Sequence, residues 1–241
     1  MIRPLVFSLV LSLPVSGFEI ASDCLQVIVG TTETWQSSHL TLSVYERTPG
    51  QSWQQTDGPW KGRCGKKGLA WGLGLHPKPS SSLIKAEGDW RSPAGVFSLG
   101  GVWGYETSVK RRPGMKYRQI TSRDLWVEDP TSPHYNRHLV LNHEPLEPWE
   151  KKAQMRQNDY PHSLKLFIAH NTDPKPVPRA GSSIFFHIWR SGGTRPTAGC
   201  TTLGEMNLRS LIAGLDPHKK PVYVLLPLQE YRRLKSAWDL P

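Results

Sequence analysis

The sequence is poor in cysteine, with three among 241 residues, and beyond its first residues it has no long apolar run. No later segment reaches the roughly 18 consecutive apolar residues that a membrane-spanning helix requires. Internal repeats, linkers and long tracts of biased composition are also missing, which argues against a disordered chain or a string of separate modules. A chain of this length can bury a substantial core, so the sequence predicts one globular domain.

The N-terminus is the one place where apolar residues run together. Arg3 precedes the stretch "PLVFSLVLSLPV", which ends in the small residues Val15, Ser16 and Gly17. A positive charge, a short apolar segment and then small residues are typical of a secretory signal peptide. We expect residues 1–17 to be removed, with a retained anchor as the alternative. The mature protein is then expected outside the cytoplasm, with no membrane-inserted segment.

Export permits disulfide bonds, and this divides the three cysteines unevenly. We expect Cys24 to pair with Cys64, which leaves Cys200 as a free thiol. A free thiol outside the cytoplasm calls for a chemical role, so Cys200 is the leading candidate for a nucleophile.

The chain is basic, with a formal net charge of +10, so its surface should attract anions. Nucleic acid is disfavoured as a partner because the basic residues are dispersed and a signal peptide removes the chain from the cytoplasm. An anionic cell-wall polymer is the better match. The alternative is a basic surface that is merely solvated.

Short apolar segments bounded by Gly, Pro, Ser and Thr predict β-strands along most of the chain. They lie at residues 25–31, 39–47, 68–75, 95–99, 164–170, 182–189 and 221–227. We therefore predict a mostly β catalytic domain over residues 24–230, followed by a C-terminal surface helix or tail over residues 231–241. Residues 104–162 are polar, aromatic and rich in proline, and an insertion of that length is expected to form one wall of a cleft.

A helix is predicted directly after Cys200. Thr202 and Glu205 have the Thr-x-x-Glu spacing of a capping box, and apolar residues follow at helical intervals. Cys200 would then lie just before the helix N-terminus, where unpaired N–H groups and the helix dipole favour a thiolate. Gly199, which has no Cβ, would let a substrate approach the backbone closely.

His187 ends the predicted strand 182–189 and is the candidate base for Cys200. A Cys–His pair generates a nucleophile near neutral pH and then supplies a proton to the leaving amine. The backbone N–H groups of the Thr197-Ala198-Gly199 turn are candidates to stabilise a developing oxyanion. Taken alone, a histidine at the end of a strand is more often an ordinary core residue.

Three separated segments resemble one protein family. They are "GSSIFFHIW" with "PTAGCTTL" around His187 and Cys200, "KAEGDWRSPAGVFSLG" at residues 85–100, and "LWVEDPTSPHYNR" at residues 125–137. Together they are similar to the YkuD-like L,D-transpeptidase catalytic domain, in the branch with Thr-Ala-Gly-Cys at the nucleophile. The similarity covers most of residues 25–227.

The resemblance implies a β-rich sandwich or barrel with a helix after the cysteine, a nucleophile at Cys200 and a general base at His187. Such enzymes attack the amide after the third residue of a peptidoglycan stem peptide, between an L-centre and a D-residue. An acyl-enzyme forms, and an amine or water resolves it. No cofactor or metal is implied, and we expect a monomer that acts on stem peptides.

This sequence departs from the commonest family motif, Ser-His-Gly-Cys-x-Arg, at three positions: Thr197 for Ser, Ala198 for His and Thr202 for Arg. The missing arginine leaves open how a substrate carboxylate is held. Arg190 and Arg195, in the loop between His187 and Cys200, are the candidates to replace it.

Alternatives from other functional classes remain at this point. With water as the acceptor, the same Cys–His pair would act as a cell-wall carboxypeptidase or endopeptidase. The ten tryptophans instead suit a non-catalytic glycan-binding module. Other clusters are given lesser roles: His134, His138 and His143 lack the spacing of a metal site, and the alternating charges of Lys85, Glu87, Asp89 and Arg91 are expected to shape the pocket.

Overall fold

The computed structural model describes residues 17–78, 80–81 and 83–241, so the predicted signal peptide lies outside the described residues except for Gly17. Its strands are β1 (Gln26–Thr32), β2 (His39–Glu46), β3 (Gln54–Arg63), β4 (Leu69–Trp71), β5 (Ser92–Gly104), β6 (Tyr117–Gln119), β7 (Asp124–Trp126), β8 (His138–Val140), β9 (Leu164–Ile168), β10 (Phe185–Ile188), β11 (Thr201–Leu203) and β12 (Val222–Pro227). The helices are α1 (Pro148–Lys152), α2 (Glu205–Gly214) and α3 (Leu228–Leu234), with short 3-10 turns at Ser191–Gly193 and Pro217–Lys219.

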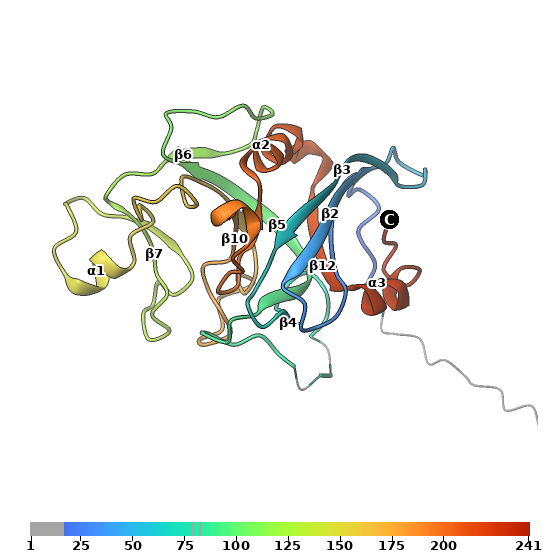
Figure 1. Cartoon of the computed structure of the whole chain (residues 1–241), viewed down its shortest axis with the longest axis horizontal. Helices are drawn as coiled ribbons and strands as arrows, with labels where there is room; N and C mark the ends of the chain where they lie inside the picture. Colours follow the sequence, from blue (N-terminus) through green and yellow to red (C-terminus); the bar gives the residue numbers. More distant parts are fainter. Residues whose placement is uncertain (1–16, 79, 82) are drawn as a thin grey trace, which may run out of the picture.

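The main sheet closes on itself. Its strands follow the order β12–β1–β2–β3–β11–β10–β9–β5, and β5 pairs again with β12, which makes a barrel (Figure 1). The pairs β1–β12 and β10–β11 are parallel. Buried apolar side chains from nearly every strand fill the interior, among them Val27, Leu42, Val96, Leu166, Phe186 and Val224. The prediction of a mostly β fold with few helices is confirmed.

Each predicted strand segment overlaps a strand of the structure, although one is much shorter than expected. Five strands were missed: β3, β6, β7, β8 and β11. The segment 68–75 contributes only β4, although the Gly72 and Leu75 amides beyond it still donate hydrogen bonds to the Ala94 and Val96 carbonyls of β5. β3 was missed because its sequence, "QQTDGPWKGR", is polar and mostly exposed and contains Gly-Pro. Its strand conformation comes from pairing with β2 and β11 rather than from its own residues.

The helix after Cys200 begins later than its sequence pattern indicates. Residues 201–203 form β11, which pairs with β10 and β3, and α2 starts at Glu205 with Gly204 as its N-cap. The predicted capping box is therefore wrong, because Thr202 is fixed in the barrel, where its Oγ1 lies 3.4 Å from the Arg63 carbonyl oxygen. Cys200 is separated from the helix by a strand.

The insertion at residues 104–162 carries β6, β7, β8 and α1 and packs against the outside of the barrel (Figure 1). Trp126 of β7 lies against Phe167 of β9 and Phe185 of β10, with ring centroids 4.4 and 4.8 Å apart. Asp124 is fully buried, and its carboxylate accepts hydrogen bonds from Arg118, Thr121 and His138. These contacts hold the insertion beside β9 and β10.

The packed domain extends beyond residues 24–230 at both ends. Ile20 is buried in the core before residue 24. The C-terminal segment forms α3 from Leu228, and Leu234, Trp238 and Leu240 are buried in the same core. The segment expected as a surface helix or tail over 231–241 thus exposes Arg232 and Arg233 and also supplies apolar side chains to the interior.

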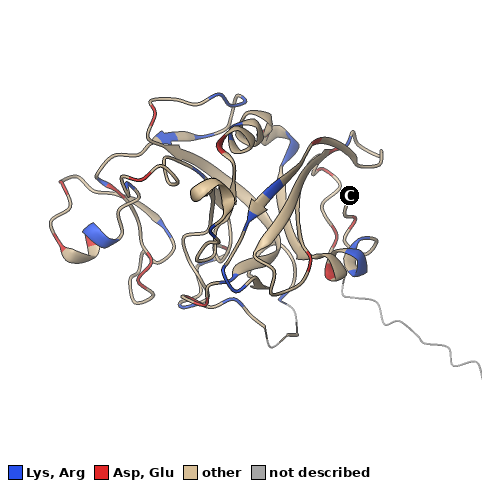
Figure 2. Cartoon of the chain, viewed as in Figure 1, with Lys and Arg blue, Asp and Glu red and all other residues tan. Residues whose placement is uncertain are grey.

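No helix in the described part of the chain is long and apolar enough to cross a membrane. Lysines and arginines are spread over α1, β3, α3 and many loops rather than gathered in one stripe (Figure 2).

Cys24 and Cys64 are both buried as free thiols, so the predicted disulfide is wrong. They lie at opposite ends of β2. The Arg47 side chain, just after β2, donates to the Cys24 carbonyl, whereas the Cys64 amide donates to the carbonyl of Ser38, just before β2. A strand rise of about 3.3 Å per residue separates these ends by more than about 20 Å, and a disulfide requires Cα atoms within about 7 Å. Burial raises the pKa of both thiols, that of Cys64 to about 12.

We predict that the unfolded, unreduced protein titrates three free thiols with a thiol-specific reagent, because no two of its cysteines are paired in the structure. The native protein should react at Cys200 first, since Cys24 and Cys64 are in the core. A count of one thiol would show that Cys24 and Cys64 are bonded after all.

Candidate active site

All the site residues predicted from the sequence line one cavity of about 490 Å³, between the insertion and the outer face of β10. They are Cys200, His187, Thr197, Ala198, Gly199, Arg190 and Arg195. The insertion contributes Glu128, Gln157 and His162, so the expectation that it walls a cleft agrees with the structure.

The register of β10 decides which side chains reach the cavity. Phe186 belongs to the barrel core, whereas its neighbours Phe185 and His187 line the cavity on the outer face. This follows from the alternation of side chains along a strand. His187 lies directly between two neighbours, Lys165 of β9 and Thr202 of β11. Both of these residues line the same cavity.

His187 is a neutral base with a fixed orientation. Its Nδ1 lies 2.8 Å from the Ile188 carbonyl oxygen, which can only accept, so Nδ1 carries the proton and Nε2 is left as the acceptor. Burial lowers the pKa of His187 to about 3, and a proton on the neighbouring His162 would lower it further. The orienting group that the sequence could not name is therefore a backbone carbonyl.

Cys200 is a protonated thiol at neutral pH. Its Sγ donates to the Ser183 carbonyl oxygen at 3.5 Å. Burial raises the pKa of this thiol to about 11, partly offset by a backbone hydrogen bond from Phe185 and by the charge of Lys165. The thiolate predicted from a helix N-terminus beside Cys200 is wrong, because α2 begins beyond β11 and desolvation raises the pKa of the thiol.

The turn before Cys200 is held by its own hydrogen bonds. The Thr197 hydroxyl donates to the Cys200 carbonyl at 2.6 Å and accepts from the Gly199 amide at 3.1 Å, and the Ser92 hydroxyl donates to the Gly199 carbonyl at 2.6 Å. A Cβ on Gly199 would lie only 3.1 Å from the Arg91 carbonyl oxygen. This position therefore favours glycine for close packing, and its N–H group is already bonded.

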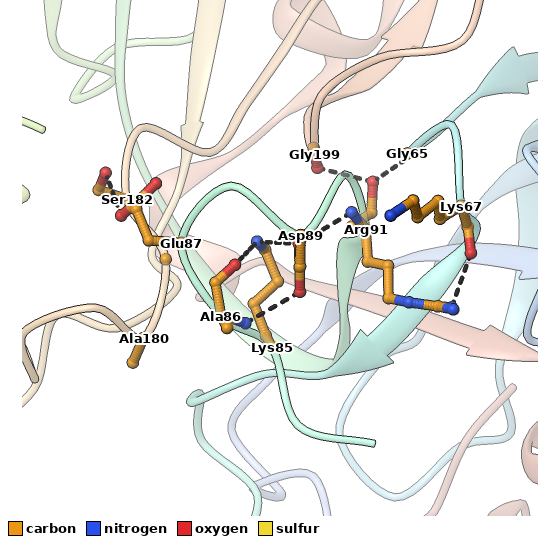
Figure 3. Close-up of polar contacts among 12 residues, drawn as sticks. Gly65, Lys67, Lys85, Ala86, Glu87, Asp89, Arg91, Ala180, Ser182 and Gly199 are labelled. Carbon is orange, nitrogen blue, oxygen red and sulfur yellow. Dashed lines mark hydrogen bonds and ion pairs between the residues drawn. The ribbon is translucent and has the colours of Figure 1, made fainter.

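The charged segment 85–91 forms another wall of the cavity, and hydrogen bonds and an ion pair hold its side chains in place (Figure 3). Lys85 Nζ lies 2.6 Å from Asp89, whose other carboxylate oxygen accepts from the Ala86 amide. Glu87 accepts a 2.8 Å hydrogen bond from Ser182, next to the Ser183 carbonyl that receives the thiol. These side chains shape the pocket, as expected from the sequence.

Asn136, from the "HYN" stretch, ties the insertion to the same region. Its amide donates to the His170 and Asn171 carbonyls, and its oxygen accepts from Trp126 and from the Ser183 amide. Ser183 has a φ of 58°, an unusual conformation for a residue with a side chain, and Asn136 stabilises it. The insertion thereby fixes the carbonyl that holds the thiol.

The two candidate arginines differ in their surroundings. Arg190 forms a 2.8 Å ion pair with Asp159, so its charge is already matched. Arg195 lines the cavity and is exposed. Thr202 is buried and carries no charge, so Arg195 is better placed to meet an incoming carboxylate.

Sequence reasoning missed three functional candidates, Lys165, His162 and Asp159. Lys165 is buried, its Nζ lies 3.0 Å from the Met155 carbonyl oxygen, and burial lowers its pKa to about 8. A lysine inside the apolar strand "LKLFI" was the available signal. His162 and Asp159 have no comparable sequence pattern, because only the fold brings them beside His187.

The three clustered histidines lie elsewhere. His138 contacts the buried Asp124, and His143 lies 3.6 Å from Glu150. Neither these two nor His134 lines the cavity, and within residues 17–78, 80–81 and 83–241 no group of His, Cys, Asp or Glu forms a metal-ligand cluster.

The sequence profile of the L,D-transpeptidase catalytic domain (YkuD) matches residues 62–224. The chain belongs to this family. The match spans β3 to β12 and includes both His187 and Cys200. The family is one of acyltransferases that act on peptidoglycan and are typically extracytoplasmic.

No curated protein sequence matches the chain. Among solved structures, it is similar to Bd1075 of Bdellovibrio bacteriovorus, with 13% identity and a TM-score of 0.38. The alignment covers 91% of this chain and 56% of that one, so the chain spans little more than half of that protein. A likeness this distant gives no information about the L,D-transpeptidase site.

We predict that alkylation of Cys200 by iodoacetamide is slow at pH 7 and accelerates toward pH 11, because burial disfavours the thiolate. Lys165→Met should slow the reaction about tenfold at pH 7, the effect of one pKa unit on the thiol. This difference should vanish above pH 8, where wild-type Lys165 loses its proton. Mass spectrometry of the Cys200 peptide gives the rates.

Lys165→Arg should retain the rate at pH 7, because it keeps the positive charge at every pH tested. Lys61→Met, which removes an exposed lysine of β3, is the matched control. An inflection below the ordinary thiol value of about 8.5 would show instead that the resting site holds a thiolate.

Proposed function

We propose that this chain is an exported, monomeric L,D-transpeptidase that transfers acyl groups from peptidoglycan stem peptides through a thioester on Cys200. The observation that carries the proposal is that a free thiol and a neutral imidazole line the same cavity, with the imidazole tautomer fixed by Ile188. The family match and the apolar N-terminal segment support the cell-wall substrate and export.

The first half of the reaction begins with a neutral thiol and a neutral base. The Cys200 thiol leaves the Ser183 carbonyl and gives its proton to Nε2 of His187, and the sulfur attacks the amide carbon after the L-centre. The C–N bond then breaks, and His187 returns the proton to the leaving amine of the D-residue. The thiolate on Cys200 and the imidazolium on His187 therefore form only when the sulfur attacks a bound substrate.

Oxyanion stabilisation is assigned to the backbone N–H groups of Ala198 and Cys200. The Thr197 and Gly199 amides already donate, to the Cys64 carbonyl and the Thr197 hydroxyl. Donors aimed at the developing charge are among the larger contributions to such reactions. The Thr197 hydroxyl therefore acts by holding the turn.

Hydrolysis is the second candidate, since water can resolve the same thioester. Its support is that exposed residues, among them Arg195 and Ala198, line the cavity, so water can reach it. A glycan-binding module is disfavoured because Trp71, Trp126 and Trp238 are buried. Trp90 lines the cavity and is half exposed, so it is the tryptophan available to contact substrate.

We predict that Cys200→Ala abolishes conversion of defined tetrapeptide stems and leaves the thermal unfolding temperature close to that of the wild type. His187→Ala should lower turnover by at least about a hundredfold, as expected for loss of a general base. Cys24→Ala, which removes a buried thiol outside the cavity, is the matched control and should stay active.

Mass spectrometry of the products separates cross-linking, exchange and hydrolysis by mass. Wild-type turnover by Cys200→Ala would contradict the nucleophile assignment. Unchanged stem peptides with the wild-type enzyme would contradict the activity itself.

We predict that Arg195→Gln raises KM about tenfold for donors with a free C-terminal carboxylate, the scale expected for loss of a charged hydrogen bond. A donor with an amidated C-terminus should show the same KM with both enzymes. Steady-state kinetics on the two donors test this. An equal KM increase for both donors would show that Arg195 does not bind this carboxylate.

A further inference from the structure

A second histidine lies against His187 in the cavity. The rings of His162 and His187 have centroids 4.6 Å apart and planes inclined by 33°. From the contacts of His162 we propose that His162 and Asp159 form a second acid–base pair, which takes the proton from the acceptor amine during acyl transfer. This inference rests on the proposed function, and it assigns the second half of that reaction to residues outside the Cys200–His187 pair.

Asp159 fixes the tautomer of His162. Its carboxylate oxygens lie 2.7 and 2.9 Å from Nδ1 of His162, and it also accepts from the His162 amide and from Arg190. These bonds lower the pKa of Asp159, although burial opposes them, so the carboxylate is ionised and only accepts. Nδ1 of His162 therefore carries the proton, and Nε2 is free to act as a base.

His162 and His187 thus present the same atom, Nε2, from differently anchored rings. His187 is anchored by the neutral Ile188 carbonyl, whereas His162 is anchored by an ionised carboxylate. A carboxylate stabilises the imidazolium that forms when Nε2 accepts a proton. His162 is also less buried than His187, which places it nearer to an amine that enters from solvent.

The charged groups around His162 keep it ready to accept a proton. Burial lowers its pKa to about 4, and the positive charges of Lys165 and Arg190 act in the same direction. Asp159 opposes them. The ring is consequently neutral when the acceptor arrives, and its carboxylate partner limits the cost of charging it.

The second half of acyl transfer requires a base, because the acceptor amine must lose a proton when it forms the new amide. After acylation, His187 has already returned its proton to the first leaving amine. The nitrogen of the neutral acceptor amine then bonds to the thioester carbon, the C–S bond breaks, and the amine proton passes to Nε2 of His162. The Cys200 thiolate recovers that proton, which restores the thiol and both neutral imidazoles.

The test separates the two halves of the reaction in single turnovers with a tetrapeptide stem as donor. Intact-mass spectrometry follows acylation of Cys200, and addition of a D-amino acid then measures transfer. His162→Ala should acylate within about twofold of the wild type and transfer about a hundredfold more slowly, the range of general base catalysis. Imidazole in solution should restore transfer by occupying the space left by the ring.

Asp159→Asn should slow transfer less than His162→Ala, because the base remains without its carboxylate. His162→Phe keeps a ring packed against His187 and should lose transfer without rescue by imidazole, which separates basicity from packing. The matched control is His143→Asn, a histidine beside Glu150 outside the cavity, which should behave as wild type.

Three results would overturn the assignment of His162: transfer at the wild-type rate, acylation slowed as much as transfer, or no rescue of His162→Ala by imidazole. If His162→Ala does not fold, loss or retention of transfer by the folded His162→Phe decides the question. Failure of the wild type to form an acyl-enzyme would instead contradict the proposed thioester on Cys200, whatever His162 does.

Discussion

The hydrogen-bonded register of β9, β10 and β11 is the constraint on which the rest of the site depends. It places Lys165, His187 and Thr202 in one row and turns His187 outward while Phe186 enters the core. Cys200 precedes β11 by one residue, so the same ladder fixes the nucleophile candidate. A slip of one residue would exchange Phe186 with His187 and would bury the imidazole inside the barrel.

The insertion turns this open barrel face into an enclosed site. Its attachment relies on the buried carboxylate of Asp124, on the packing of Trp126 against Phe167 and on the amide of Asn136. Asn136 also bonds the Ser183 amide, so the part of the chain that closes the cavity positions the carbonyl that accepts the thiol proton. The insertion therefore both closes the cavity and positions the Ser183 carbonyl.

Burial determines the charge state of the enclosed groups. It raises the pKa of Cys200, lowers those of His187 and His162, and lowers that of Lys165 to about 8. The resting thiol and imidazoles are neutral, so ionisation accompanies substrate attack. Arg190 and Asp159 neutralise each other at the rim, where Arg195 stays exposed.

The sequence by itself determined the β-rich class, most strands and the residues around Cys200 and His187, because these depend on local apolar patterns and on contiguous motifs. It failed for β3, for the start of α2 and for the Cys24–Cys64 pairing. It also could not find His162, Asp159 or Lys165 as partners of His187. Only the tertiary structure decided these, since strand pairing can override local propensity and because burial, which sets the pKa of Cys200, arises from segments far apart in the chain.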